Sequence, residues 1–205
     1  MSLFLFVCMS VSAQTAALKT NILGWATTTP NLGVEFGVGR KSTIQVFGAL
    51  NPWDFGKDKH FRIWSVQPEY RYWFCEKFGG HFIGVHALGG QYNAKNFNFP
   101  LKALIVSSSV TPVTEGDPAS AEKGWPDLTS DENKGRHVEG WYVGAGITYG
   151  YQWILSHHWN LEASIGVGYV YSSLDFYGRC KRTIDTRKLH YVGPTKAAVS
   201  IMYMF

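Results

Sequence analysis

Residues 159–171, WNLEASIGVGYVY, alternate between two kinds of side chain along most of their length. The odd-numbered positions form a continuous apolar face, whereas the even-numbered positions are mainly small or polar. The preceding segment, residues 141–153, WYVGAGITYGYQW, repeats the pattern. A period of two residues is typical of a β-strand with two different faces. These two segments therefore predict a pair of neighbouring strands.

The same alternation recurs along the rest of the chain and predicts six further strands. It is clear near the C-terminus and in three segments of the first half, and it is weaker in two others. The six segments are residues 18–26, 32–38, 44–50, 64–74, 82–92 and 195–205. We therefore expect eight strands in total.

The connections between these strands alternate in length. The short ones are residues 39–42, 75–80 and 154–158, and the others are residues 27–31, 51–61, 93–139 and 173–190. Short turns at one end and longer loops at the other are typical of membrane-spanning barrels with an even number of strands. The sequence thus predicts an all-β fold, an eight-stranded antiparallel up-and-down transmembrane β-barrel with a long outer loop at about 93–139.

Aromatic residues bracket the predicted strands. From Trp141 to Tyr151 there are about ten residues, which span roughly 25 Å in a tilted strand and match the apolar band of an outer-membrane barrel. We predict an aromatic girdle of Trp64, Phe74, Trp141, Tyr151, Trp153, Trp159, Tyr169 and Tyr171. A soluble, lipocalin-like barrel remains the alternative, because alternation alone does not say which face points outward.

The face assigned to the interior is rich in Gly, Ser and Ala and carries six charges. Three are positive and three negative: Lys19, Glu35, Glu69, Arg71, Glu162 and Lys196. Buried charges need partners, so we predict one connected cluster of ion pairs across the lumen. An eight-stranded barrel is only wide enough for its own side chains, so such a cluster would close it.

The composition and the two ends of the chain indicate an exported protein. Only 17% of the 205 residues are charged, against about 25% in ordinary soluble domains. The net charge of +4 comes from scattered residues, which argues against nucleic acid as a partner. Residues 1–13 read as a signal peptide, which leaves residues 14–205 as the barrel. The last strand carries Ile201, Tyr203 and Phe205 on one face, and this ending resembles the signal read by the barrel-assembly machinery.

Several short stretches carry a family resemblance. They are Lys19-Thr20-Asn21, Pro30-Asn31-Leu32-Gly33-Val34-Glu35, Tyr149-Gly150-Tyr151-Gln152-Trp153, Trp159-Asn160-Leu161-Glu162 and Gly193-Pro194-Thr195-Lys196. Over nearly the whole mature chain, the sequence resembles a family of uncharacterised small outer-membrane barrels of Bacteroidota. The resemblance implies an outer-membrane location and a link to fimbrial or cell-envelope loci, and it implies no activity.

No set of residues points to catalysis, a cofactor or a metal. His157 and His158 are adjacent on a short turn and lack a third ligand. Cys75 and Cys180 fall at opposite ends of the predicted barrel, so we expect no disulfide between them. The apolar residues 101–113 within the long loop are a candidate partner contact.

We therefore predict a non-enzymatic scaffold, structural or adhesive, in the outer membrane of a Gram-negative cell. Its expected partners are outer-membrane lipid, the barrel-assembly machinery, and envelope or fimbrial proteins reached through the outer loops. A lipid-modifying or proteolytic barrel enzyme is the first alternative, and a secreted carrier is the second.

Overall fold

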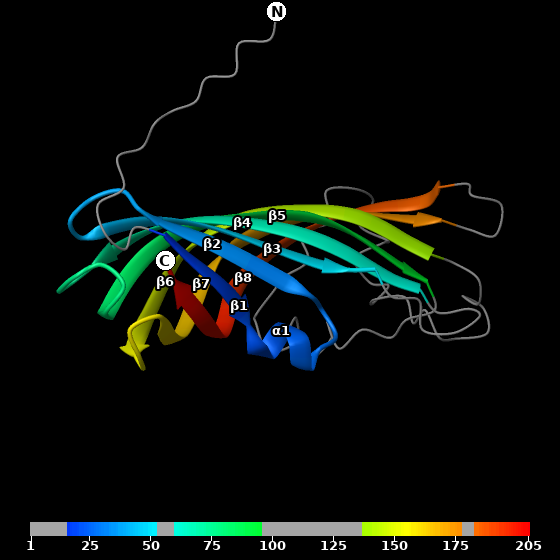
Figure 1. Ribbon diagram of the computed structural model, residues 1–205. Coiled ribbons are helices and arrows are strands. Elements are labelled where there is room, and N and C mark those ends of the chain that lie inside the picture. The colour runs from blue at the N-terminus through cyan, green and yellow to red at the C-terminus, as the bar shows by residue number, and fades with distance from the viewer. Residues whose placement is uncertain (1–15, 53–59, 96–136, 178–182) are drawn as a thin grey trace, which may run out of the picture.

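The computed structural model describes residues 16–52, 60–95, 137–177 and 183–205, which form a closed barrel of eight strands (Figure 1). Each strand pairs antiparallel with the next one in the sequence, and β1 pairs with β8 to close the ring. The predicted eight-stranded antiparallel barrel is thus confirmed. The predicted signal peptide and most of the predicted long loop lie outside the described residues.

The strands lengthen from the start of the chain to its end, and one short helix follows the first strand. The elements are β1 (Ala16–Asn21), α1 (Ile22–Ala26), β2 (Asn31–Gly37), β3 (Ser42–Asn51), β4 (His60–Trp73), β5 (Gly80–Lys95), β6 (His137–Ile154), β7 (Trp159–Tyr177) and β8 (Thr183–Met204). Within the described ranges, no helix is long and apolar enough to cross a membrane.

The last four strands extend beyond the ends of β1 and β2 (Figure 1). The connection predicted at 173–190 is therefore too long, because β7 continues to Tyr177 and β8 begins at Thr183. The pairing of β7 with β8 includes Ser173 opposite Lys188. A strand ladder depends on backbone hydrogen bonds, which continue where the apolar alternation of the side chains has stopped. We call the end of the barrel to which the last four strands extend the loop end, and the opposite end the turn end.

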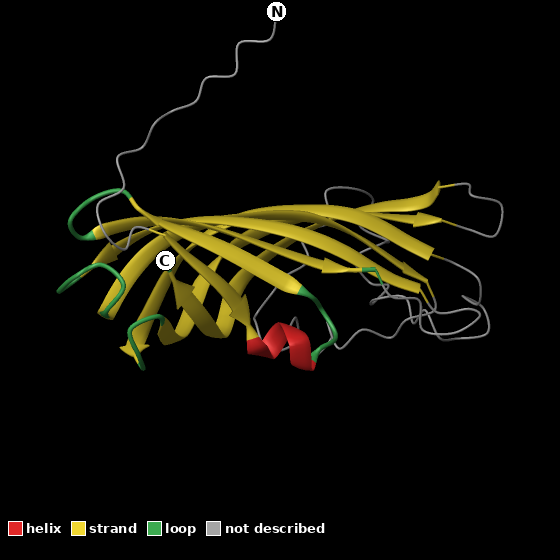
Figure 2. Cartoon of the chain, in the orientation of Figure 1, coloured by secondary structure: helices red, strands yellow, loops and turns green. Residues whose placement is uncertain are grey.

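The predicted first strand, residues 18–26, is wrong in its second half. The strand ends at Asn21, and the next five residues form α1, the helix drawn in red in Figure 2. The side chain of Asn21 caps this helix by accepting a hydrogen bond from the Leu23 amide at 3.1 Å. The indole of Trp25 then donates to the Thr20 hydroxyl at 2.7 Å. These local bonds stop β1 early and leave β8 with a short partner.

A β-bulge in β8 changes the predicted faces of that strand. Gly166 of β7 pairs with Lys196 and Val167 pairs with Pro194, so Thr195 is the extra residue. A bulge places two neighbouring side chains on the same side of the sheet. Thr195, which the alternation predicted to share the face of Phe205, therefore points into the barrel together with Lys196.

Candidate functional site

Five strands bring the six predicted interior charges to one level of the lumen. Each of these side chains is on the inward face of its strand, and all but Lys196 belong to fully buried residues. They are Lys19 on β1, Glu35 on β2, Glu69 and Arg71 on β4, Glu162 on β7 and Lys196 on β8. The structure joins all six in one network, which we call the lumen network.

Arg71 lies at the centre of the lumen network and contacts all three carboxylates. Its two Nη atoms donate to both oxygens of Glu162, at 2.7 and 3.0 Å. Nη1 also contacts Glu35 Oε2 at 3.0 Å, and Nε donates to Glu69 Oε1 at 2.8 Å. The guanidinium lies 4.4 Å from the ring centroid of Phe82. A planar group with several fixed donors can serve three acceptors at once, which an ammonium does less well.

The two lysines complete the charge balance. Lys19 Nζ lies 2.5 Å from Glu35 Oε2 and 2.9 Å from Glu162 Oε2. Lys196 Nζ forms an ion pair with Glu69. With Arg71, these side chains give three positive and three negative charges, so the network as a whole is neutral.

Hydroxyl and indole groups tie the lumen network to the turn end. Thr43 donates to Glu35 Oε1 at 2.6 Å, and Trp73 Nε1 donates to the Thr43 hydroxyl at 2.9 Å. The Trp73 ring packs at 4.8 Å from the Phe82 ring and at 6.2 Å from the Phe78 ring. Trp73 and Phe82 are fully buried. Between the lumen network and the turn end, aromatic side chains therefore fill the barrel.

His86 on β5 is a lumen residue that the sequence analysis did not single out. Its Nδ1 lies 2.8 Å from the Thr148 hydroxyl, and its Nε2 lies 2.9 Å from the Thr195 hydroxyl. Both ring nitrogens thus have partners, and the imidazole links β5, β6 and β8. The weak alternation of residues 82–92 concealed the position of His86, and the bulge concealed that of Thr195.

Glycines make room for this histidine. A Cβ on Gly146 or Gly166 would come within about 3.0 Å of His86 Cε1. Gly168 is still more confined, because its Cβ would lie 2.3 Å from the Ala145 carbonyl oxygen and 2.7 Å from the Gly146 Cα. The strands can approach each other this closely only because these residues have no side chain.

We expect Gly168→Ala to lower the free energy of unfolding by about 1–3 kcal/mol, the usual cost of overpacking. The measurement is a urea titration of the folded barrel in detergent or lipid vesicles. Gly48→Ala is the matched control, because its Cβ would meet nothing closer than the Leu32 carbonyl oxygen at 3.8 Å. Equal stability of the two variants would contradict the close approach at Gly168.

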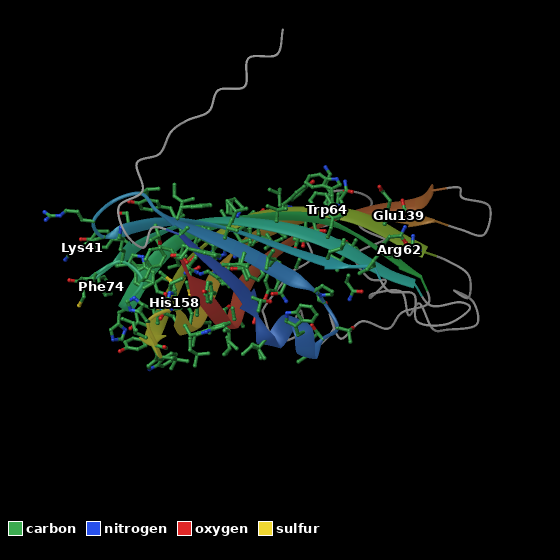
Figure 3. All side chains as sticks on the ribbon, in the orientation of Figure 1. Lys41, Arg62, Trp64, Phe74, Glu139 and His158 are labelled. Atoms are coloured by element: carbon green, nitrogen blue, oxygen red, sulfur yellow. The ribbon has the colours of Figure 1, made fainter. Side chains whose placement is uncertain are left out.

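The eight residues of the predicted aromatic girdle all lie on the outward face. Six of them are exposed, and Tyr151 and Tyr171 are half-buried. Trp64 lies towards the loop end and Phe74 at the turn end (Figure 3). The strand registers place Trp141, Tyr169 and Tyr171 towards the loop end with Trp64. They place Tyr151, Trp153 and Trp159 towards the turn end with Phe74. We call these two groups the loop-end belt and the turn-end belt.

The predicted assembly signal ends β8 beside the turn-end belt. Ile201, Tyr203 and Phe205 point outward, while Met202 and Met204 are buried inside. The Tyr203 ring lies 5.2 Å from both the Trp159 and the Phe205 rings. Recognition of this ending by an assembly machine stays a prediction.

Other residues weighed from the sequence lie apart from the lumen. His157 and His158 stack edge to face on their turn, and Cys75 is exposed with a free thiol. Cys180 and residues 101–113 lie outside the described residues. Within the described part of the chain, no three His, Cys, Asp or Glu side chains are arranged to hold a metal.

Comparisons with known proteins give a family and no activity. A search of curated proteins found no match. The model of one family matches residues 1–205, the whole length of the chain, and the description of that family is "Protein of unknown function (DUF3575)". The chain therefore belongs to this family of unknown function, DUF3575.

Proposed function

We propose that this protein spans the outer membrane of a Gram-negative bacterium as a β-barrel and acts as a structural or adhesive scaffold. Its strands contact lipid, the lumen network closes its interior, and its outer loops present binding surfaces to envelope or fimbrial partners. Export by a signal peptide, insertion by the barrel-assembly machinery and an origin in Bacteroidota are parts of the same proposal.

The distribution of polar and apolar side chains is the observation that carries this proposal. Among the described residues, sixteen buried ones are polar or charged and only six are hydrophobic. Large apolar side chains instead cover the outside, including Val85, Ile147 and Ile165 at 56–62% exposure. Soluble proteins rarely expose apolar surface on this scale. Lipid is the environment in which such an outer surface is favourable, because it removes the apolar side chains from water.

The two aromatic belts agree with this orientation. Tyrosine and tryptophan concentrate at both membrane–water interfaces in outer-membrane barrels, with an apolar band about 25 Å tall between them. On β7, Trp159 begins the band and Tyr171 ends it, with Leu161, Ile165 and Val167 between them. The closed interior favours a scaffold over a channel, because aromatic rings and ion pairs occupy the half of the lumen nearer the turn end.

Cell fractionation tests the proposal. We expect the protein in the outer-membrane fraction, resistant to a urea wash and extracted only by detergent. On a denaturing gel, the unheated sample should migrate differently from the boiled one, because a closed barrel resists unfolding by detergent. Recovery as a soluble protein without detergent would overturn the proposal and favour a carrier. Recovery in the membrane without a mobility shift would argue against a closed barrel.

A further inference from the structure

A polar cavity of about 150 Å³ lies behind the seam where β1 meets β8. We call it the seam chamber and define it by six of its lining residues: Lys19, Asn21, Gln45, Gln67, Lys196 and Ala198. It adjoins the lumen network, since two of these residues are members of both. A cavity of this size and polarity holds a small polar group or several waters.

The seam chamber lies against the barrel wall at the point where β1 ends. The pairing of β1 with β8 stops at Asn21 opposite Ser200, whereas β8 continues towards the loop end. Ala197, which is exposed on the outward face, also lines the cavity. The cavity therefore borders the barrel wall beside the end of β1, where α1 lies against β8.

This part of the wall lies between the two aromatic belts. Ala197 pairs with Ile165, while the belt residues Trp159 and Tyr169 pair with Tyr203 and Val192 of the same strand. If the barrel spans a membrane as proposed above, this part of the wall faces the lipid. The inference that follows rests on that proposed function.

The walls of the seam chamber offer hydrogen-bond donors that have at most one partner among the described residues. Gln67 Nε2 is buried and makes no hydrogen bond within the described part of the chain. Lys196 Nζ carries three hydrogens, and Glu69 is its one partner among the described residues. Gln45 Oε1, in the same wall, is a buried acceptor with no partner among the residues that the structure describes. A buried donor without a partner costs about 1–3 kcal/mol, so an acceptor entering the chamber would be bound favourably.

The charge balance decides which acceptor fits. The lumen network is already neutral, so a phosphate or carboxylate would bring an uncompensated charge into the barrel wall, which is costly. A carbonyl oxygen accepts the same hydrogen bonds without adding charge. In a membrane, the ester groups of acyl chains carry such oxygens.

We propose that the seam chamber binds the acyl-ester carbonyl of a membrane lipid that enters between β8 and α1. Gln67 and Lys196 donate hydrogen bonds to the carbonyl oxygen. The chain of the lipid crosses the wall beside Ala197 and lies over the exposed apolar side chains of Leu23 and Trp25.

Native mass spectrometry of the detergent-solubilised barrel tests this inference with three probes. The first is a diacyl phosphatidylethanolamine, and the second is its diether analogue, which keeps the headgroup and the chains but lacks the carbonyls. The third is inorganic phosphate as a competitor. We expect one diacyl lipid retained per chain, about tenfold weaker retention of the diether, and no competition by phosphate.

Filling the cavity supplies the variant. Ala198→Leu should abolish retention of the diacyl lipid, whereas Ala49→Leu, at an inward alanine of β3 that does not line the chamber, should preserve it. Equal binding of the two lipids, retention by the Ala198 variant, or displacement by phosphate would each overturn the inference. A heat-dependent gel shift shows in the same samples that the barrel is folded. A soluble protein would instead refute the proposed function.

Discussion

Arg71→Met should be among the most destabilising single substitutions in this barrel, with a loss of about 3–5 kcal/mol in the free energy of unfolding. The substitution removes the group that contacts Glu35, Glu69 and Glu162 together. Three buried carboxylates would then face only Lys19 and Lys196. The uncompensated charge, more than the lost contacts, causes the expected effect.

Urea titration in lipid vesicles, followed by the gel shift of the folded form, measures this loss. Arg40→Met is the control, because Arg40 is exposed in the turn between β2 and β3 and its removal should change the stability by less than about 0.5 kcal/mol. Adding Glu162→Gln to Arg71→Met should restore part of the stability, since it removes one excess negative charge. If the double variant loses more free energy of unfolding than the two single substitutions added together, charge imbalance is not the cause of the loss.

Ile165→Arg should destabilise the barrel by about 2–4 kcal/mol in a lipid bilayer. Ile165 is 59% exposed on the outward face of β7, six residues from both Trp159 and Tyr171, so it lies midway across the proposed apolar band. An arginine at this depth must leave water for hydrocarbon, or distort the bilayer to reach water.

The depth dependence distinguishes lipid from water. Val192→Arg places the same charge on β8 at the loop-end belt, opposite Tyr169, where the cost should fall to about 0–1 kcal/mol. In a soluble barrel both positions face water, and both substitutions would be nearly neutral. Equal effects of the two variants in vesicles would therefore count against a membrane-spanning wall.

The backbone pattern of this barrel is readable from the sequence because each strand has one apolar and one small or polar face. The alternation predicted the inward side of β7 and hence of Glu162, and it did the same for Lys19, Glu35, Glu69 and Arg71. Charge neutrality then predicted that these side chains would meet. No pairwise contact was predictable, because the relative heights of inward residues depend on the strand registers.

Three features escaped prediction for local reasons. The bulge at Thr195 breaks the period of two, and no composition signal marks it apart from the adjacent Pro194. The helix after β1 depends on one capping bond from Asn21, in a segment whose residues alternate weakly. The position of His86 could be predicted only if the inward face of β5 was known. The glycines and alanines of this strand weaken the apolar alternation that would have identified that face.

The closure between β1 and β8 also orders the events of folding. Seven of the eight strand pairs join neighbours in the sequence, but the eighth joins Ala17 to Met204, and the amide of Phe205 donates to the Ala16 carbonyl at 3.0 Å. This pairing requires the longest loop closure in the chain, so it is entropically the slowest to form. Until β8 is complete, the polypeptide is a curved open sheet with two unpaired edges, which are templates for aggregation. The two edges of the sheet therefore become paired only at the final step of folding, when the last residues of β8 meet the first strand.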